Sequence, residues 1–131
     1  MRYFLIIFIA ILAFSNCKPS QVATQQNITA SDTLRIANDS LEYEIIIIEP
    51  GFNSWLVTQR PPEYYSLSFL ENRNVFYVAS YNRRVINSTQ YPPDLYPLQI
   101  NYDPQIRYGL EVNYLLYNYF VYFEERYNQK L

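Results

Sequence analysis

The side chains that most enzymes use for catalysis are scarce in this chain. Its 131 residues include one cysteine, Cys17, and no histidine. Without histidine, the commonest zinc sites and acid–base arrangements are excluded, and no serine has a histidine partner or stands in a Gly-x-Ser-x-Gly turn. Two glycines are too few for a glycine-rich phosphate-binding loop. We therefore expect a protein that is not an enzyme, with no catalytic residues, no metal and no cofactor.

Paired carboxylates are the remaining catalytic possibility. Glu42 and Glu44 share one face of a predicted strand, whereas Glu124 and Glu125 are helix neighbours that point apart. A glycoside hydrolase needs two carboxyl groups at a set separation around its sugar, and sequence spacing does not fix that separation. Because most such side chains are solvated, a small hydrolase or carbohydrate-binding protein with Glu and Tyr in a cleft is the alternative expectation.

Polar side chains on two predicted helices form a further candidate site. Asn74 interrupts an apolar helical stripe, and Glu111 and Asn113 lie in the last predicted helix. Together with Arg83 they form either a buried polar network that fixes the helix register or a ligand pocket that also contains tyrosines. The sequence favours the structural network, because buried polar groups normally find hydrogen-bond partners.

Tyrosine is unusually frequent, with 15 copies against one tryptophan. Its apolar ring and polar hydroxyl suit half-buried seams between helices and a sheet, and they also suit an aromatic binding surface. Tyr114, Tyr117 and Tyr122 fall outside the main apolar stripe of the last helix, so we expect them at a second contact surface. For any single tyrosine, packing is the stronger expectation.

The first residues have the pattern of an export signal. A positive start at Arg2 precedes the apolar run Tyr3–Phe14, and a short polar stretch then ends in Cys17. Twelve residues rise only about 18 Å as a helix, which is short of a hydrocarbon core of about 30 Å. We therefore predict a cleaved signal peptide over residues 1–16 rather than a transmembrane span.

Cys17 stands where the signal of a bacterial lipoprotein ends. The preceding residues resemble a lipobox, although its best form has an aliphatic residue in place of Phe14 and a small one in place of Asn16. Ordinary cleavage after Ser15 is the alternative. Because the only cysteine falls at this position, we predict lipid attachment at Cys17, and more than one acyl chain gives a durable anchor. The expected location is the bacterial cell envelope, lipid-anchored and facing the periplasm.

The remaining chain divides into two predicted parts. Residues 17–33 are predicted as the lipidated N-terminus and a flexible tether, because Lys18–Asp32 is polar and shows no period. Residues 34–131 are predicted as a single globular domain. With 10 basic and 12 acidic residues and no long charge run, the chain lacks the basic surface that nucleic acid requires. The expected partners are the membrane, through the lipid anchor, and an envelope protein or cell-wall component.

The domain is predicted to be of the α+β class, with a short antiparallel or mixed sheet of two to three strands against two long helices. Leu41–Glu49 is the clearest strand because it is rich in isoleucine. Leu98–Tyr102 alternates between apolar and polar residues and is predicted as a second strand. Thr33–Ala37 is predicted as a weak third strand. On the first strand, alternate residues from Leu41 to Ile47 face the core, and the far half of the other face is expected to be covered.

Two proline signals place the helices. One helix is predicted from Pro62 to about Asn87, because proline suits the first helical turn. The other is predicted from Asp103 and Pro104 to about Tyr127, with the aspartate as N-cap.

Several segments resemble a known family. They run from the strand and turn at Tyr43-Glu44 and Pro50-Gly51-Phe52, through Ser54-Trp55-Leu56, Pro62-Glu63-Tyr64-Tyr65 and Tyr81-Asn82-Arg83-Arg84, to Tyr108–Tyr114 and Leu116–Phe120. Over about two thirds of the chain, Tyr43–Tyr127 is similar to an uncharacterised domain found in small lipoproteins of Gram-negative bacteria. The resemblance implies the lipoprotein setting and no activity. The expected function is a membrane-anchored, non-enzymatic binding or structural module with an aromatic surface.

Overall fold

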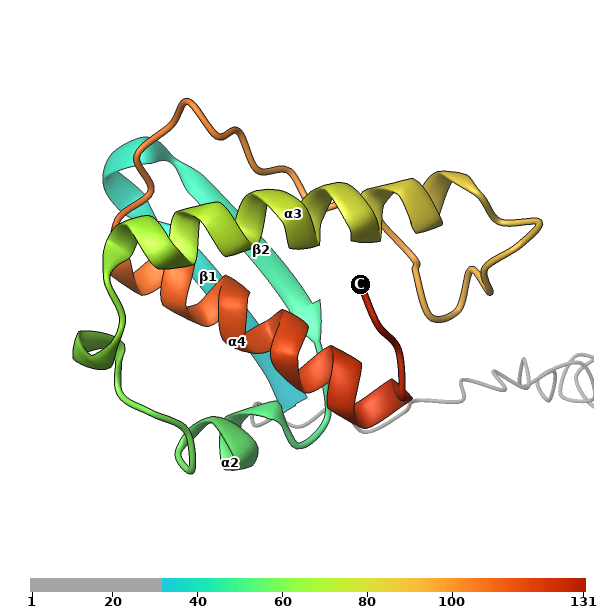
Figure 1. Cartoon of the computed structure of the whole chain (residues 1–131), viewed down its shortest axis with the longest axis horizontal. Coiled ribbons are helices and arrows are strands. Elements are labelled where there is room, and N and C mark those ends of the chain that lie inside the picture. Colours follow the sequence, from blue (N-terminus) through green and yellow to red (C-terminus); the bar gives the residue numbers. More distant parts are fainter. Residues whose placement is uncertain (1–31) are drawn as a thin grey trace, which may run out of the picture.

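The computed structural model describes residues 32–131, which form a β-hairpin beneath two long helices (Figure 1). Strand β1 (Thr33–Asn38) pairs antiparallel with β2 (Tyr43–Ile48), and the register sets Thr33 opposite Ile48. Isoleucine and threonine favour the strand conformation because their side chains branch at Cβ. A 3-10 turn (Asp39–Leu41) and Glu42, whose φ of 51° is left-handed, reverse the chain between the strands.

The helices follow the hairpin in chain order. A short helix, α2 (Phe52–Leu56), and a 3-10 turn (Pro62–Tyr64) lead into α3 (Leu67–Ile86), and a long loop then leads to α4 (Leu110–Tyr127). Ser66 caps α3, because its hydroxyl accepts a hydrogen bond from the backbone N–H of Phe69 at 3.3 Å. Helix α4 packs on the sheet and α3 packs on α4 (Figure 1).

One hydrophobic core joins these elements. Ile36 of β1, Phe52 of α2 and both Leu116 and Phe120 of α4 are fully buried. Tyr81 of α3 lies in the same cluster and is 3% exposed. Burying an aromatic or branched side chain of this kind contributes about 1.5–3 kcal/mol each, so the hairpin and helices stabilise one another.

The predicted α+β class, with a short sheet against two long helices, is confirmed. The clearest predicted strand corresponds to β2 and the weak one to β1. Tyr43, Ile45 and Ile47 are half-buried on the inner face as expected. The expected cover on the other face was wrong for the described residues, because Ile46 and Ile48 are 62% and 53% exposed.

The prediction of a strand at Leu98–Tyr102 was wrong. The amide of Asn82 on α3 uses both backbone groups of Ile100: its Nδ2 donates to the carbonyl oxygen at 2.8 Å, and its Oδ1 accepts from the N–H at 2.8 Å. The Tyr43 hydroxyl donates to the carbonyl oxygen of Asn101 at 2.6 Å. Side chains thus take the backbone groups that a third strand would use to pair with β2.

The predicted start of the last helix was also wrong. Asp103 closes only a short turn, in which its Oδ1 accepts from the N–H of Gln105 at 2.8 Å. The helix begins seven residues later, at Leu110, after Gly109 with a φ of 89°. A Cβ at Gly109 would meet nothing within 4 Å, so close packing does not require the glycine. Its left-handed backbone is what requires glycine.

Within residues 32–131, no helix is both long enough and apolar enough to cross a membrane. The predicted signal peptide, Cys17 and nearly all of the predicted tether lie outside the described residues.

Candidate functional site

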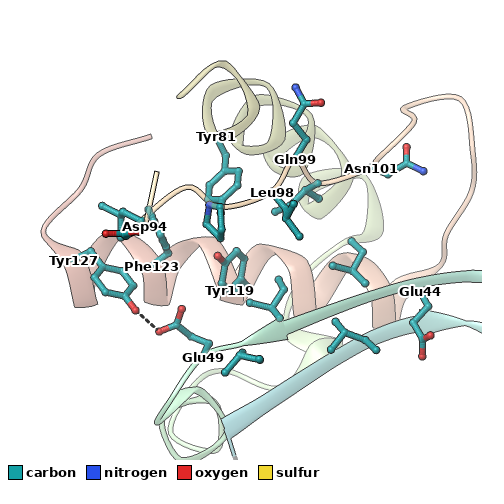
Figure 2. Close-up of a pocket in the computed structure, with 17 residues that line it drawn as sticks. Glu44, Glu49, Tyr81, Asp94, Leu98, Gln99, Asn101, Tyr119, Phe123 and Tyr127 are labelled. Carbon is teal, nitrogen blue, oxygen red and sulfur yellow. Dashed lines mark hydrogen bonds between the residues drawn. The ribbon is translucent and has the colours of Figure 1, made fainter. Parts of the chain in front are cut away.

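A groove of about 510 Å³ runs along β2 (Figure 2). Its floor is formed by Glu44–Glu49 and its roof by the loop residues 94, 95 and 97–101. The inner wall comes from the helices, with Tyr81 of α3 and Tyr119, Phe123 and Tyr127 of α4. A volume of this size and a mainly apolar lining with few polar groups are typical of ligand-binding sites.

The Asn82 bonds hold the roof of the groove against α3, and the Tyr43 bond joins Asn101 of the roof to the first residue of β2. Leu98 lies in this roof and is 77% exposed. An exposed leucine over half-buried isoleucines gives the groove two apolar sides without closing it. The space next to β2 is therefore open where the sequence predicted a third strand.

Glu49 is the polar centre of the groove. Its carboxylate points into the groove, where Oε1 accepts a hydrogen bond from the Tyr127 hydroxyl at 2.8 Å (Figure 2). The residue is only 5% exposed, and within the described chain no basic side chain forms an ion pair with it. Burial raises the pKa of Glu49, while the Tyr127 hydrogen bond and the charge of Arg126 partly oppose this rise.

The tyrosines of the groove remain neutral donors and acceptors. The hydroxyls of Tyr81 and Tyr119 share a hydrogen bond, and burial raises the pKa of both. Burial and the neighbouring Glu49 raise the pKa of Tyr127 to about 12. Their rings give an apolar wall, and their hydroxyls are used within the protein.

The groove lining contains two further carboxylates, Glu44 and Asp94. Glu44 lines the other end of the groove and is ion-paired with Arg35 on the outer face of the hairpin. Asp94 is exposed. Across residues 32–131 no cluster of three or more Asp, Glu, Cys or His side chains could hold a metal ion. The groove therefore offers one buried carboxylate in an aromatic and aliphatic setting.

The structure brings Asn74 and Asn113 together between the helices. The Asn74 Nδ2 donates to the backbone carbonyl of Asn113 at 2.9 Å and to its Oδ1 at 3.0 Å. The same Oδ1 accepts from the Tyr102 hydroxyl at 2.8 Å, and the Asn113 Nδ2 donates to the carbonyl of Gly109 at 2.8 Å. Both asparagines are fully buried, so this network joins α3, α4 and the loop between them.

Arg83 and Glu111 do not join this network. Both residues are exposed, because they lie on the solvent sides of α3 and α4. The expectation that they would contribute to a network or a ligand pocket with the asparagines is corrected accordingly.

The expected second contact surface is also corrected. Tyr114 and Tyr122 are each 7% exposed, and Tyr117 is half-buried. The Tyr114 hydroxyl donates to the carbonyl of Arg60, and the Tyr122 hydroxyl donates to that of Pro50, each at 2.7 Å. These side chains fix the segments between β2 and α3 against α4.

Sequence reasoning missed the residues that define the groove. Glu49 lies two residues after Ile47, on the strand face that Tyr43, Ile45 and Ile47 share. Its burial could have been inferred because alternate residues of a strand point to the same face. Asn82 gave no such signal, because an asparagine on a long helix is normally a surface residue.

Glu49→Gln is expected to stabilise the protein at neutral and alkaline pH. The variant keeps an oxygen acceptor for Tyr127 but carries no charge. The pKa of Glu49 is higher in the folded state than in the unfolded state. The wild type therefore loses stability as the pH rises from the ordinary pKa of a glutamate through the raised pKa of folded Glu49. The difference in the free energy of unfolding between variant and wild type should be absent in acid. At neutral pH and above it should amount to about 1.4 kcal/mol for each unit by which folding raises the pKa of Glu49.

Urea unfolding at a series of pH values measures this difference. Glu63→Gln is the matched control, because Glu63 is exposed and lies away from the groove, and its effect should stay within about 0.5 kcal/mol. Equal stability of Glu49→Gln and wild type at every pH would show that Glu49 is not held in a desolvated site.

No curated protein and no solved structure matches the chain. A family model matches residues 3–131. The chain therefore belongs to DUF6146, a family of unknown function.

Proposed function

We propose that the protein is a lipid-anchored binding protein of the bacterial cell envelope, which takes up its ligand in the groove and catalyses no reaction. The groove carries this proposal, because it combines an apolar, aromatic lining with one buried carboxylate that forms no ion pair with the described residues. Such a combination supports binding with a fixed orientation. The family gives no activity that argues against it.

The alternative is a carbohydrate-binding protein or a hydrolase that uses Glu49 and the tyrosines. The Tyr127–Glu49 pair favours it. One observation argues against it: Tyr81 and Tyr119 are each 3% exposed and offer no free ring face to a sugar.

The anchor is proposed at Cys17, after removal of residues 1–16. The support is the apolar run that precedes the single cysteine. Fifteen residues separate Cys17 from Thr33, the first residue of β1. Fully extended, they reach about 50 Å, so the groove would lie in the periplasm within that distance of the membrane.

Photo-crosslinking in native cells tests the binding proposal. A photoreactive amino acid replaces Leu98, which lines the groove and is largely exposed, so that the substitution leaves the core intact. The control carries the same amino acid in place of Val57, which is 84% exposed and lies outside the groove. We expect a defined crosslinked product from position 98 that position 57 does not give.

A further inference from the structure

The outer edge of β2 is unpaired in the described chain. The N–H of Glu49 donates to the carbonyl of Asp32 at 2.7 Å, which continues the β1–β2 ladder. Because the groups of an antiparallel strand point alternately to its two sides, those of Glu44, Ile46 and Ile48 point away from β1. No backbone hydrogen bond between described residues uses these outward groups.

Within β2 this edge has no lysine, no proline and no bulge to protect it. Natural edges are blunted by lysine, proline, bulges or very short strands. The six residues of β2 read YEIIII, and they pair with β1 without a bulge. Ile46 and Ile48, with more than half of their surfaces exposed, flank the outward groups. The edge is therefore suited to pairing with another strand.

The groove lies where the side chains of such a strand would go. A strand added to β2 runs about 4.8 Å from it and places alternate side chains on the two faces of the sheet. One set enters the groove between Ile47 and Leu98, and the other lies beside Ile46 and Ile48. The length of β2 corresponds to about 20 Å of extended chain.

The charges of the groove decide which strand fits. Glu44 lies at one end and Glu49 and Asp94 lie at the other, and the groove lining contains no lysine or arginine. A second copy of β2 would bring only further carboxylates to the interface between the two strands, from Glu42, Glu44 and Glu49. Charge complementarity thus favours a partner strand with a basic residue over self-association.

We propose that the groove binds an extended segment of a partner protein, which pairs with β2 as a third strand. Every second side chain of this segment is apolar and enters the groove, and a lysine or arginine of the segment contacts Glu49. This inference rests on the proposed binding function and names its ligand class. The backbone bonds supply affinity, and the apolar groove and Glu49 supply specificity.

Residue-resolved hydrogen exchange on the full chain in detergent tests the inference. The probes are a set of synthetic octapeptides with alternating valine and serine. Each peptide carries a single lysine, at a different position in each member of the set, and a matched set carries glutamate in place of lysine. The best lysine peptide should slow exchange of the Ile46 and Ile48 amides at least tenfold. The Ile45 and Ile47 amides, bonded to β1, serve as the internal control. The glutamate peptides should bind at least tenfold more weakly.

Two variants and one modified peptide sharpen the test. Glu49→Gln should weaken the lysine peptide about tenfold, and the distant Glu63→Gln should leave it unchanged. N-methylation of alternate peptide amides on the pairing side should abolish protection. The inference is overturned if no lysine peptide protects these amides, if glutamate peptides bind equally well, or if N-methylation has no effect.

Other occupants give different signatures. Protection without any peptide that disappears when residues 18–31 are deleted would assign the edge to the chain's own N-terminal segment. Protection that grows with protein concentration would assign it to a second copy. Either result contradicts the partner segment. A groove-specific crosslink in cells together with unprotected amides would overturn strand addition and leave the binding function standing.

Discussion

Replacing Cys17 by serine is expected to release the protein from the membrane fraction. Serine offers no thiol to the acyl donor, so the variant lacks the lipid chains, each of whose buried CH₂ groups contributes about 0.8 kcal/mol to anchoring. Fractionation of cells with and without detergent measures the distribution. The intact mass of the wild-type protein, extracted in detergent, should show a mature chain that begins at Cys17 and carries acyl groups.

The mass also separates the possible reasons for an unexpected distribution. A wild-type chain that begins at Asn16 with a free thiol would show ordinary cleavage after Ser15 and contradict the anchor. Lys18→Ser is the matched control, because it changes the neighbouring residue and keeps the thiol, and it should remain in the membrane fraction. A mature, cleaved Cys17→Ser chain that stays membrane-bound would equally contradict the anchor.

Asn113→Ala is expected to lower the free energy of unfolding by about 3 kcal/mol. The change removes the Asn113 side-chain bonds to Asn74, Tyr102 and Gly109. Each of the three lost hydrogen bonds contributes about 1 kcal/mol net, so the loss adds up to about 3 kcal/mol. Because the network joins α3 to α4, its loss should also reduce the cooperativity of unfolding.

Asn118→Ala is the matched control for this prediction. Asn118 is also on α4 and 2% exposed, but its Nδ2 makes one bond, to the carbonyl of Tyr114 at 2.8 Å. Urea unfolding followed by circular dichroism should give a loss of about 1 kcal/mol for this variant. Equal losses for the two variants would argue that the network does not hold the helices in register.

The periodic elements of the fold could be predicted from the sequence. The isoleucine-rich run predicts β2, and the apolar stripe with one asparagine predicts both α3 and the burial of Asn74. These signals are local, because period two and period 3.6 follow from backbone geometry alone. The helical period sets Arg83 about 180° from Asn74 and Glu111 about 200° from Asn113 around their helices, so the exposure of both residues also follows from the sequence.

The loop before α4 could not be predicted in the same way. Leu98–Tyr102 has an alternating pattern, but its backbone is held by the Asn82 side chain from another element. A five-residue pattern cannot indicate that a helix side chain will replace a neighbouring strand. The groove follows from that replacement, and so the candidate site depends on a tertiary contact rather than on a motif.

Photo-crosslinking from position 98 in native cells is the most direct test of ligand binding in the groove. Position 98 should give a discrete product whose mass spectrum identifies a partner segment, and position 57 should give none. Glu49→Gln in the same chain should reduce the yield from position 98. Equal products from positions 98 and 57, or no product from position 98, would contradict a binding function for the groove.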